Sequence, residues 1–127
     1  MERYHLQDFL NRGHELGFVK ETDNPQFLGW VLIRKREPDS ARSLSLHSLE
    51  EEPEYFREQD LLRSRPYQVR TVELDRDVFD SHRYETPEDF RLNDIRYFFS
   101  LDEVAEFIGR FGLTLEDIKW PIEINAP

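Results

Sequence analysis

The sequence predicts an α+β fold: an antiparallel β-sheet of four to six strands, with an N-terminal helix and a C-terminal helical segment. Three observations support this prediction. Apolar residues recur with helical spacing over residues 3–16, residues 27–36 form an aliphatic and aromatic run typical of a strand, and a capping box at residue 100 opens a second apolar helical stripe. A chain of 127 residues corresponds to about one domain, so we expect a single domain over residues 1–127.

The first predicted element is an amphipathic helix over residues 3–16. Gly17 suits the left-handed position that follows a helix, and Phe18 suits the apolar contact after it. Residues 22–25 (TDNP) then predict a turn. The apolar stripe of this helix consists of Leu6, Phe9, Leu10 and Leu16.

Residues 27–36 (FLGWVLIRKR) are the strongest strand signal in the chain, because they are rich in β-branched and aromatic residues. After a short polar loop, residues 43–47 alternate with a period of two. Together the two runs predict a β-hairpin over residues 27–48, and Glu37 and Asp39 would lie near its tip.

A helix is expected to begin at Pro53 and to end before Pro66. A strand over residues 67–74 follows, but its apolar residues change phase halfway, and a β-bulge near Thr71 would reconcile the two halves. The two halves are Tyr67 with Val69 and Val72 with Leu74. A further strand is expected over residues 94–101, and its inward-facing residues would be Ile95, Tyr97 and Phe99.

The C-terminal region predicts a helix, a short helical turn and an edge strand. Ser100 and Glu103 form the capping box that opens the helix, and Gly112 ends it. Thr114 caps the short turn, and Pro121 stops it. The strand would contain Ile122 and Ile124. The predicted core of the whole fold consists of Leu6, Phe9, Leu10, Trp30, Leu32, Val72, Tyr97, Phe99, Val104, Phe107, Ile108 and Phe111.

The formal net charge is −10, from 27 acidic and 17 basic residues. Nucleic-acid binding depends on a basic face, so this charge argues against it and favours cationic partners, either divalent cations or a basic protein. The chain has no cysteine, which excludes disulfides and thiol chemistry. No apolar run suits a signal peptide or a membrane span, and we expect a cytoplasmic protein without a membrane partner.

The sequence contains none of the common catalytic motifs. It has no nucleophile elbow, no glycine-rich phosphate loop and no dinucleotide fingerprint. The four histidines lack metal-ligand spacing, and His5 and His14 would lie on opposite faces of a helix. We therefore expect a protein without catalytic residues, not an enzyme.

The stretch VELDRDVFD places four carboxylates within residues 73–80. In an extended chain Glu73, Asp75 and Asp77 would share one face about 7 Å apart and would repel one another. Calcium takes about six to eight oxygen ligands, and a divalent ion between these carboxylates would remove the repulsion. The stretch does not match an EF-hand loop, so we expect a non-EF-hand site with a dissociation constant of about 10⁻⁵ to 10⁻³ M. The predicted metal ligands are Asp75, Asp77 and Asp80, followed by Glu73, Asp39 and Glu37.

The chain is small and acidic, lacks cysteine and mixes helices with strands. Several of its acids stand in loop-like settings, namely Asp39, Asp75, Asp77 and Asp80. In these features it resembles the small cyanobacterial calcium-binding protein CcbP. The resemblance implies calcium binding and buffering through surface carboxylates, without catalysis. It rests on size, acidity and the lack of an EF-hand, and no residue role is transferred from it.

The alternative function is an interaction or immunity-type protein that neutralises a basic protein partner. Acidic clusters steer such encounters and aromatic side chains anchor them, so this function predicts an exposed aromatic patch beside the acids. Intramolecular neutralisation of the acidic stretch is the plainest explanation of its charge. The arginines available for it are Arg76, Arg83, Arg91 and Arg96.

Overall fold

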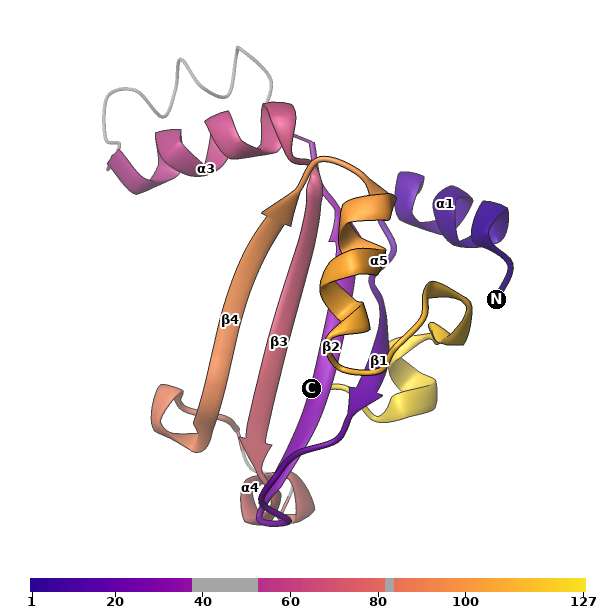
Figure 1. Cartoon of the computed structure of the whole chain (residues 1–127). Helices are drawn as coiled ribbons and strands as arrows, with labels where there is room; N and C mark the ends of the chain where they lie inside the picture. The colour runs from indigo at the N-terminus through magenta and orange to yellow at the C-terminus, as the bar shows by residue number, and fades with distance from the viewer. Residues whose placement is uncertain (38–52, 82–83) are drawn as a thin grey trace.

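The computed structural model describes residues 1–37, 53–81 and 84–127, and these residues form an α+β fold. Four antiparallel strands pair in the sequential order β1-β2-β3-β4 (Figure 1). The predicted fold class is therefore confirmed. The helices are α1 (Arg3–Asn11), α3 (Pro53–Ser64), α4 (Arg76–Asp80) and α5 (Leu101–Gly109), the strands are β1 (Leu16–Lys20), β2 (Phe27–Lys35), β3 (Tyr67–Asp75) and β4 (Phe90–Phe98), and the short 3₁₀ helices are η1 (Pro87–Asp89), η2 (Leu115–Asp117) and η3 (Pro121–Ile124).

Each face of the sheet carries a buried cluster. Helices α1 and α5 pack on one face, where the larger buried cluster includes Leu10, Val31, Val69 and Ile108. Helix α4 and η3 contribute Val78 and Ile124 to a smaller cluster, which includes Trp30 and Leu74 on the opposite face. Adjacent side chains of a strand point to opposite faces, so the central strands β2 and β3 are apolar on both sides.

This two-sided burial explains the phase change within β3. Tyr67 belongs to the cluster under α5, whereas Val72 belongs to the cluster under α4. The predicted bulge near Thr71 is wrong, because Thr71 pairs regularly with Asp94. The register of the β3–β4 ladder shifts between Glu73 and Leu74 instead, and Arg91 is the extra residue on β4.

Several elements are confirmed close to their predicted bounds, namely strands β2 and β3 and helices α3 and α5. One half of the predicted capping box of α5 is present: the Ser100 hydroxyl accepts a hydrogen bond from the Glu103 amide at 3.3 Å. The Glu103 carboxylate accepts a hydrogen bond from the Phe99 amide at 2.7 Å, instead of from the Ser100 amide that a capping box would use. The Ser100 hydroxyl thus satisfies one donor that the first turn of the helix leaves free.

The N-terminal region differs from the prediction. Helix α1 ends at Asn11, and Gly13 adopts the positive φ of 85° that ends it. Residues 16–20 form β1, a strand that was not predicted: Leu16 was expected to end the helix and Gly17 to follow it as a cap. Strand β1 pairs with β2 across the predicted turn at 22–25. The opposite edge of β2 pairs with β3. The second strand of the predicted hairpin, residues 43–47, lies outside the described residues.

Two predictions near the C-terminus are wrong. Phe99 is 67% exposed rather than buried: it follows the end of β4 and belongs to neither cluster. The segment with Ile122 forms η3 instead of an edge strand, and Ile122 is 87% exposed. Ile124 is buried, and its carbonyl accepts a hydrogen bond from the Trp30 indole at 2.7 Å.

The rest of the predicted core is largely correct. Seven of its residues are buried, namely Leu6, Leu10, Trp30, Leu32, Val72, Val104 and Ile108. Phe9, Phe107 and Phe111 are partly buried against the cluster under α5. Tyr97 is partly exposed on β4, beside Ile95, which is 46% exposed.

Candidate functional site

The acidic stretch at residues 73–80 does not form a continuous extended ladder. Strand β3 ends at Asp75, and the next five residues form α4. Glu73 therefore lies on the strand, whereas Asp77 and Asp80 lie on a short helix with a different direction and periodicity. The predicted row of Glu73, Asp75 and Asp77 on one face of a strand therefore ends at Asp75.

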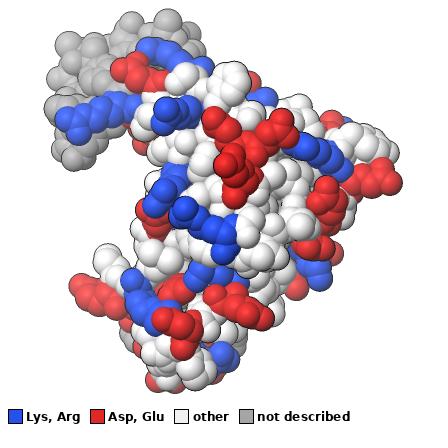
Figure 2. All heavy atoms as spheres, in the orientation of Figure 1, with Lys and Arg blue, Asp and Glu red and all other residues white. Residues whose placement is uncertain are grey.

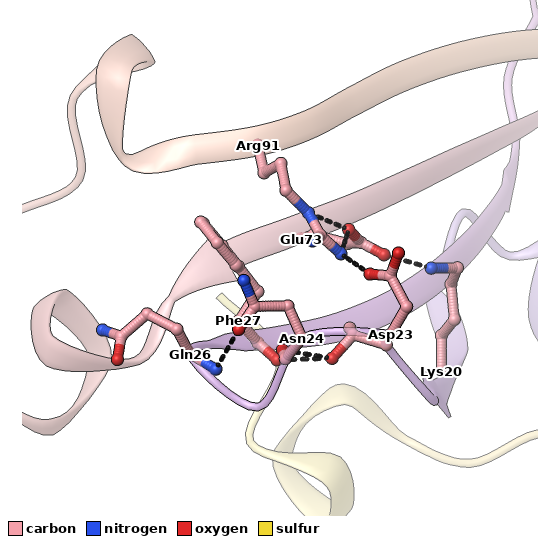
Figure 3. A network of polar contacts seen from close by, with 8 residues as sticks. Lys20, Asp23, Asn24, Gln26, Phe27, Glu73 and Arg91 are labelled. Carbon is pink, nitrogen blue, oxygen red and sulfur yellow. Dashed lines mark hydrogen bonds and ion pairs between the residues drawn. The ribbon is translucent and has the colours of Figure 1, made fainter.

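Glu73 is buried in a network of ion pairs and is only 5% exposed. Its carboxylate pairs with Lys20 of β1, and it accepts a hydrogen bond from the Arg91 Nε at 2.7 Å (Figure 3). The same guanidinium donates to Asp23 at 2.6 Å. The four side chains carry two positive and two negative charges, so the network neutralises itself.

The β-bulge brings Arg91 into this network. Regular alternation would point Arg91 and its neighbour Leu92 to opposite faces of the sheet. The extra residue lets Arg91 reach Glu73 on the α5 face, where its guanidinium also stacks over Phe27 at 4.6 Å.

The network shifts the pKa values of its carboxylates. Burial alone raises the pKa of Glu73, but hydrogen bonds from Lys20 and Arg91 outweigh it and hold the pKa below the ordinary 4.5. The hydrogen bond from Arg91, followed by its charge, lowers the pKa of Asp23. Both carboxylates are therefore held in the ionised form that the two cations require.

Asp75 also has a local structural role. Its carboxylate accepts a hydrogen bond from the Asp77 amide at 2.8 Å, which caps the N-terminus of α4. It accepts a second hydrogen bond from the Gln26 side chain at 3.0 Å. A cation at Asp75 would compete with both donors.

The remaining predicted metal ligands are separated in space. Glu37 follows the end of β2 that pairs with Tyr67, whereas Asp75 lies at the end that pairs with Phe27. Eight residue steps along a strand separate these ends by roughly 26 Å. Asp39 lies outside the described residues. Asp77 and Asp80 are exposed on α4, and the described part of the chain contains no group of three or more potential ligands that could hold a metal ion.

Beside α4 lies a feature that the sequence did not locate, which we call the α4 groove. It consists of two adjoining hollows of about 670 and 370 Å³ that share Phe79 and Asn125. Tyr84 is 94% exposed at this groove, next to Glu85. The larger hollow is lined by Leu74, Val78, Phe79, Tyr84, Glu85, Pro121, Ile122, Asn125, Ala126 and Pro127. Besides the two shared residues, the smaller hollow is lined by Val19, Lys20, Glu21, Thr22, Phe27, Leu28, Gly29, Trp30, Arg76, Asp80 and Ile124.

The surface charge is uneven around these features. Figure 2 shows acidic side chains gathered over α5, whereas acidic and basic side chains alternate at the end of the sheet near α4. The exposed acids of α5 are Asp102, Glu103 and Glu106. Asp102 pairs with Arg3 of α1, so part of this acidic surface is neutralised within the chain.

The fold and the groove define the class: an acidic α+β protein built on a four-stranded antiparallel meander. No family model, curated protein or solved structure matches the chain. Within the described residues, no helix has the length and apolar character needed to cross a membrane.

Proposed function

We propose that the protein is a non-catalytic binding module that holds a basic segment of a partner protein in the α4 groove. The observation that supports this proposal is the position of exposed apolar side chains beside carboxylates. Tyr84 and Ile122 are 94% and 87% exposed, and both line the larger hollow together with Glu85.

The apolar part of the groove supplies the contact area. Aromatic side chains in a pocket contribute most of the binding energy at protein interfaces, and exposed apolar residues that gather around a hollow mark such interfaces. Phe79 lies between the two hollows, with its ring 5.7 Å from that of Trp30. A partner side chain in either hollow would contact this ring.

The charged rim supplies the preference for a basic partner. Asp80 lines the smaller hollow and Glu85 the larger one, and the two side chains form no ion pair with any described residue. Arg76, the basic residue of α4, donates its Nε hydrogen bond to the Pro25 carbonyl at 2.8 Å. The carboxylates of the rim are therefore available to lysine or arginine side chains of a partner, and their field would accelerate the encounter.

The test places a photo-crosslinking amino acid at Tyr84 and, as a matched control, at Phe99. Both side chains are exposed aromatics, but Phe99 lies at the opposite end of the sheet. We expect a specific adduct from native lysate at position 84 alone, and the captured protein should carry a basic segment at the crosslink. Equal adducts at both positions would contradict the proposal.

The captured partner is then purified and titrated against the wild type, Tyr84→Ala and the double variant Asp80→Asn/Glu85→Gln. Loss of the aromatic anchor should weaken binding at least about tenfold. The charge variant should mainly slow association and reduce its salt dependence. Unchanged affinity in Tyr84→Ala would overturn the α4 groove as the binding site.

Calcium binding is a second candidate, supported by Asp77 and Asp80. Both are exposed on α4 without an ion-pair partner among the described residues. Two carboxylates supply fewer oxygens than the six to eight that calcium takes, so water would complete the coordination and binding would be weak. Partner binding that persists in a chelator distinguishes the protein-binding function from the calcium function.

A further inference from the structure

Two arginines lie next to each other on the sheet face opposite α5. Arg34 of β2 pairs with Gln68, and Arg70 of β3 pairs with Leu32. The arginines thus occupy diagonal positions on neighbouring strands, where side chains begin about 7–8 Å apart and long side chains can meet. This site and the α4 groove lie on the same face of the sheet, but towards opposite ends of it.

Each guanidinium is held in place by a neutral amide. Arg34 donates its Nε hydrogen bond to the Gln68 side-chain oxygen at 3.2 Å, and Arg70 donates its own to the Asn93 side-chain oxygen at 3.1 Å. Arg70 also stacks over the ring of Phe90 at 5.8 Å. Gln68 is only 6% exposed, so its position is fixed by packing.

Neither guanidinium has a carboxylate partner among the described residues. Arg91 provides the contrast, because it pairs with both Glu73 and Asp23. In a chain of net charge −10, two adjacent arginines that form no ion pair with a described carboxylate are unexpected. The hydrogen bonds at Nε leave the terminal N–H groups, which form the usual fork for an oxyanion.

A hollow of about 280 Å³ lies between these side chains. Both arginines and both amides line it, and Leu32 and Ile95 add apolar surface. Its size suits a small molecule rather than a folded domain.

We propose that this hollow binds the oxyanion group of a small ligand, either a carboxylate or a phosphate, between Arg34 and Arg70. The anion removes the repulsion between the two cations and accepts hydrogen bonds from both guanidinium forks. The apolar side chains contact the remainder of the ligand. The proposal is independent of partner binding in the α4 groove, because the two sites share no lining residue.

Glu15 gives the proposal a directional test. Its side chain lines the same hollow, and its carboxylate would repel an anion bound there. Replacement by glutamine keeps the size of the side chain and removes the charge. Glu15→Gln should therefore bind the anion more tightly than the wild type, an effect that a merely structural role for the arginines does not explain.

The experiment is a calorimetric titration with inorganic phosphate and, separately, with succinate, at an ionic strength held constant with sodium chloride. We expect Arg34→Gln and Arg70→Gln each to weaken binding about tenfold. Arg110→Gln is the matched control: Arg110 stacks on Phe107 at 5.0 Å and has no carboxylate partner among the described residues. It should bind as the wild type does.

A second readout does not depend on heats. The side-chain amide resonances of Gln68 and Asn93 should shift on titration in the wild type, because both amides contact the arginines that hold the anion. Arg34→Lys retains the positive charge without the fork, so it should fold normally and still bind more weakly. Phosphate binding without succinate binding assigns a phosphate ligand, and the reverse assigns a carboxylate. The proposal would be overturned if neither anion gave heat or a resonance shift, or if Arg34→Gln and Arg70→Gln bound as tightly as the wild type.

Discussion

Glu73 shows how a single residue in an acidic stretch can have a structural role. Its charge is met by Lys20 and Arg91, which lie far from it in the sequence. The sequence predicted that arginines of the chain neutralise the acidic stretch. The ion pair of Arg91 with Glu73 agrees with this prediction, whereas Arg96 pairs with Asp94, outside the stretch. The role of Lys20 was not predicted, because it depends on β1, and the sequence predicted no strand before residue 27.

Replacing Glu73 by glutamine should destabilise the fold by about 3 kcal/mol, because Lys20 would remain nearly buried without a counter-charge. Chemical denaturation measures this loss. The control is the double variant Lys20→Met/Glu73→Leu, which removes both charges and should recover most of the stability. Wild-type stability in Glu73→Gln would contradict the assigned role of the ion pairs.

The same carboxylate predicts an acid-dependent loss of stability. The pKa of Glu73 is lower in the folded protein than the ordinary 4.5, so the folded state favours ionised Glu73. This contribution is fully present above about pH 4.5 and is lost as the pH falls through the folded pKa. Denaturation midpoints of the wild type should therefore fall more steeply below pH 4.5 than those of Glu73→Gln; parallel pH profiles would argue against the shift.

Individual elements were predictable where their signals are local. The capping box and apolar stripe of α5 lie within a dozen residues, and β2 is a long run of strand-forming residues. Strand β1 has five residues, too few to separate a period of two from the end of a helix. The phase change of β3 was visible in the sequence, but its cause is burial on both faces, which depends on helices distant in the chain.

Gly17 should be the most sensitive position of β1. A Cβ atom there would lie 2.7 Å from the Val31 carbonyl oxygen and 2.7 Å from a Leu32 methyl carbon. Gly17→Ala should therefore cost about 2 kcal/mol of stability through overpacking. Gly109→Ala is the matched control, because a Cβ atom at this helical position meets nothing within 4 Å and should be neutral or stabilising. Thermal denaturation of both variants distinguishes local crowding from a general effect of alanine.

At the scale of the whole molecule, the sequence identified the acidic residues but not their distances. Glu37 and Asp75 were assigned to one site, yet they lie at opposite ends of the sheet. The α4 groove combines residues from β3, α4 and η3, so no local pattern could predict it. Its exposed aromatic Tyr84 beside Glu85 is the kind of patch expected of an interaction protein, which is why protein binding comes before calcium as the proposed function.

Calcium titration tests whether the remaining carboxylates of the acidic stretch act together. Glu73 and Asp75 are held by hydrogen bonds, which leaves Asp77 and Asp80 as ligands on α4. Two carboxylates on a short helix provide few of the oxygens that calcium requires, so we expect a dissociation constant of about 10⁻³ M. Binding heat and a rise in melting temperature should therefore be seen only near millimolar calcium.

Asp77→Asn/Asp80→Asn should abolish this response, whereas Glu37→Gln, at the far end of the sheet, should leave it unchanged. Magnesium chloride at the same ionic strength is the control for charge screening, because both salts screen the net charge of −10 equally. Magnesium requires a more regular set of ligands than calcium, so a response to calcium alone indicates coordination. An identical rise with both salts, retained in the double variant, would mean that screening alone stabilises the protein and that calcium has no site on α4.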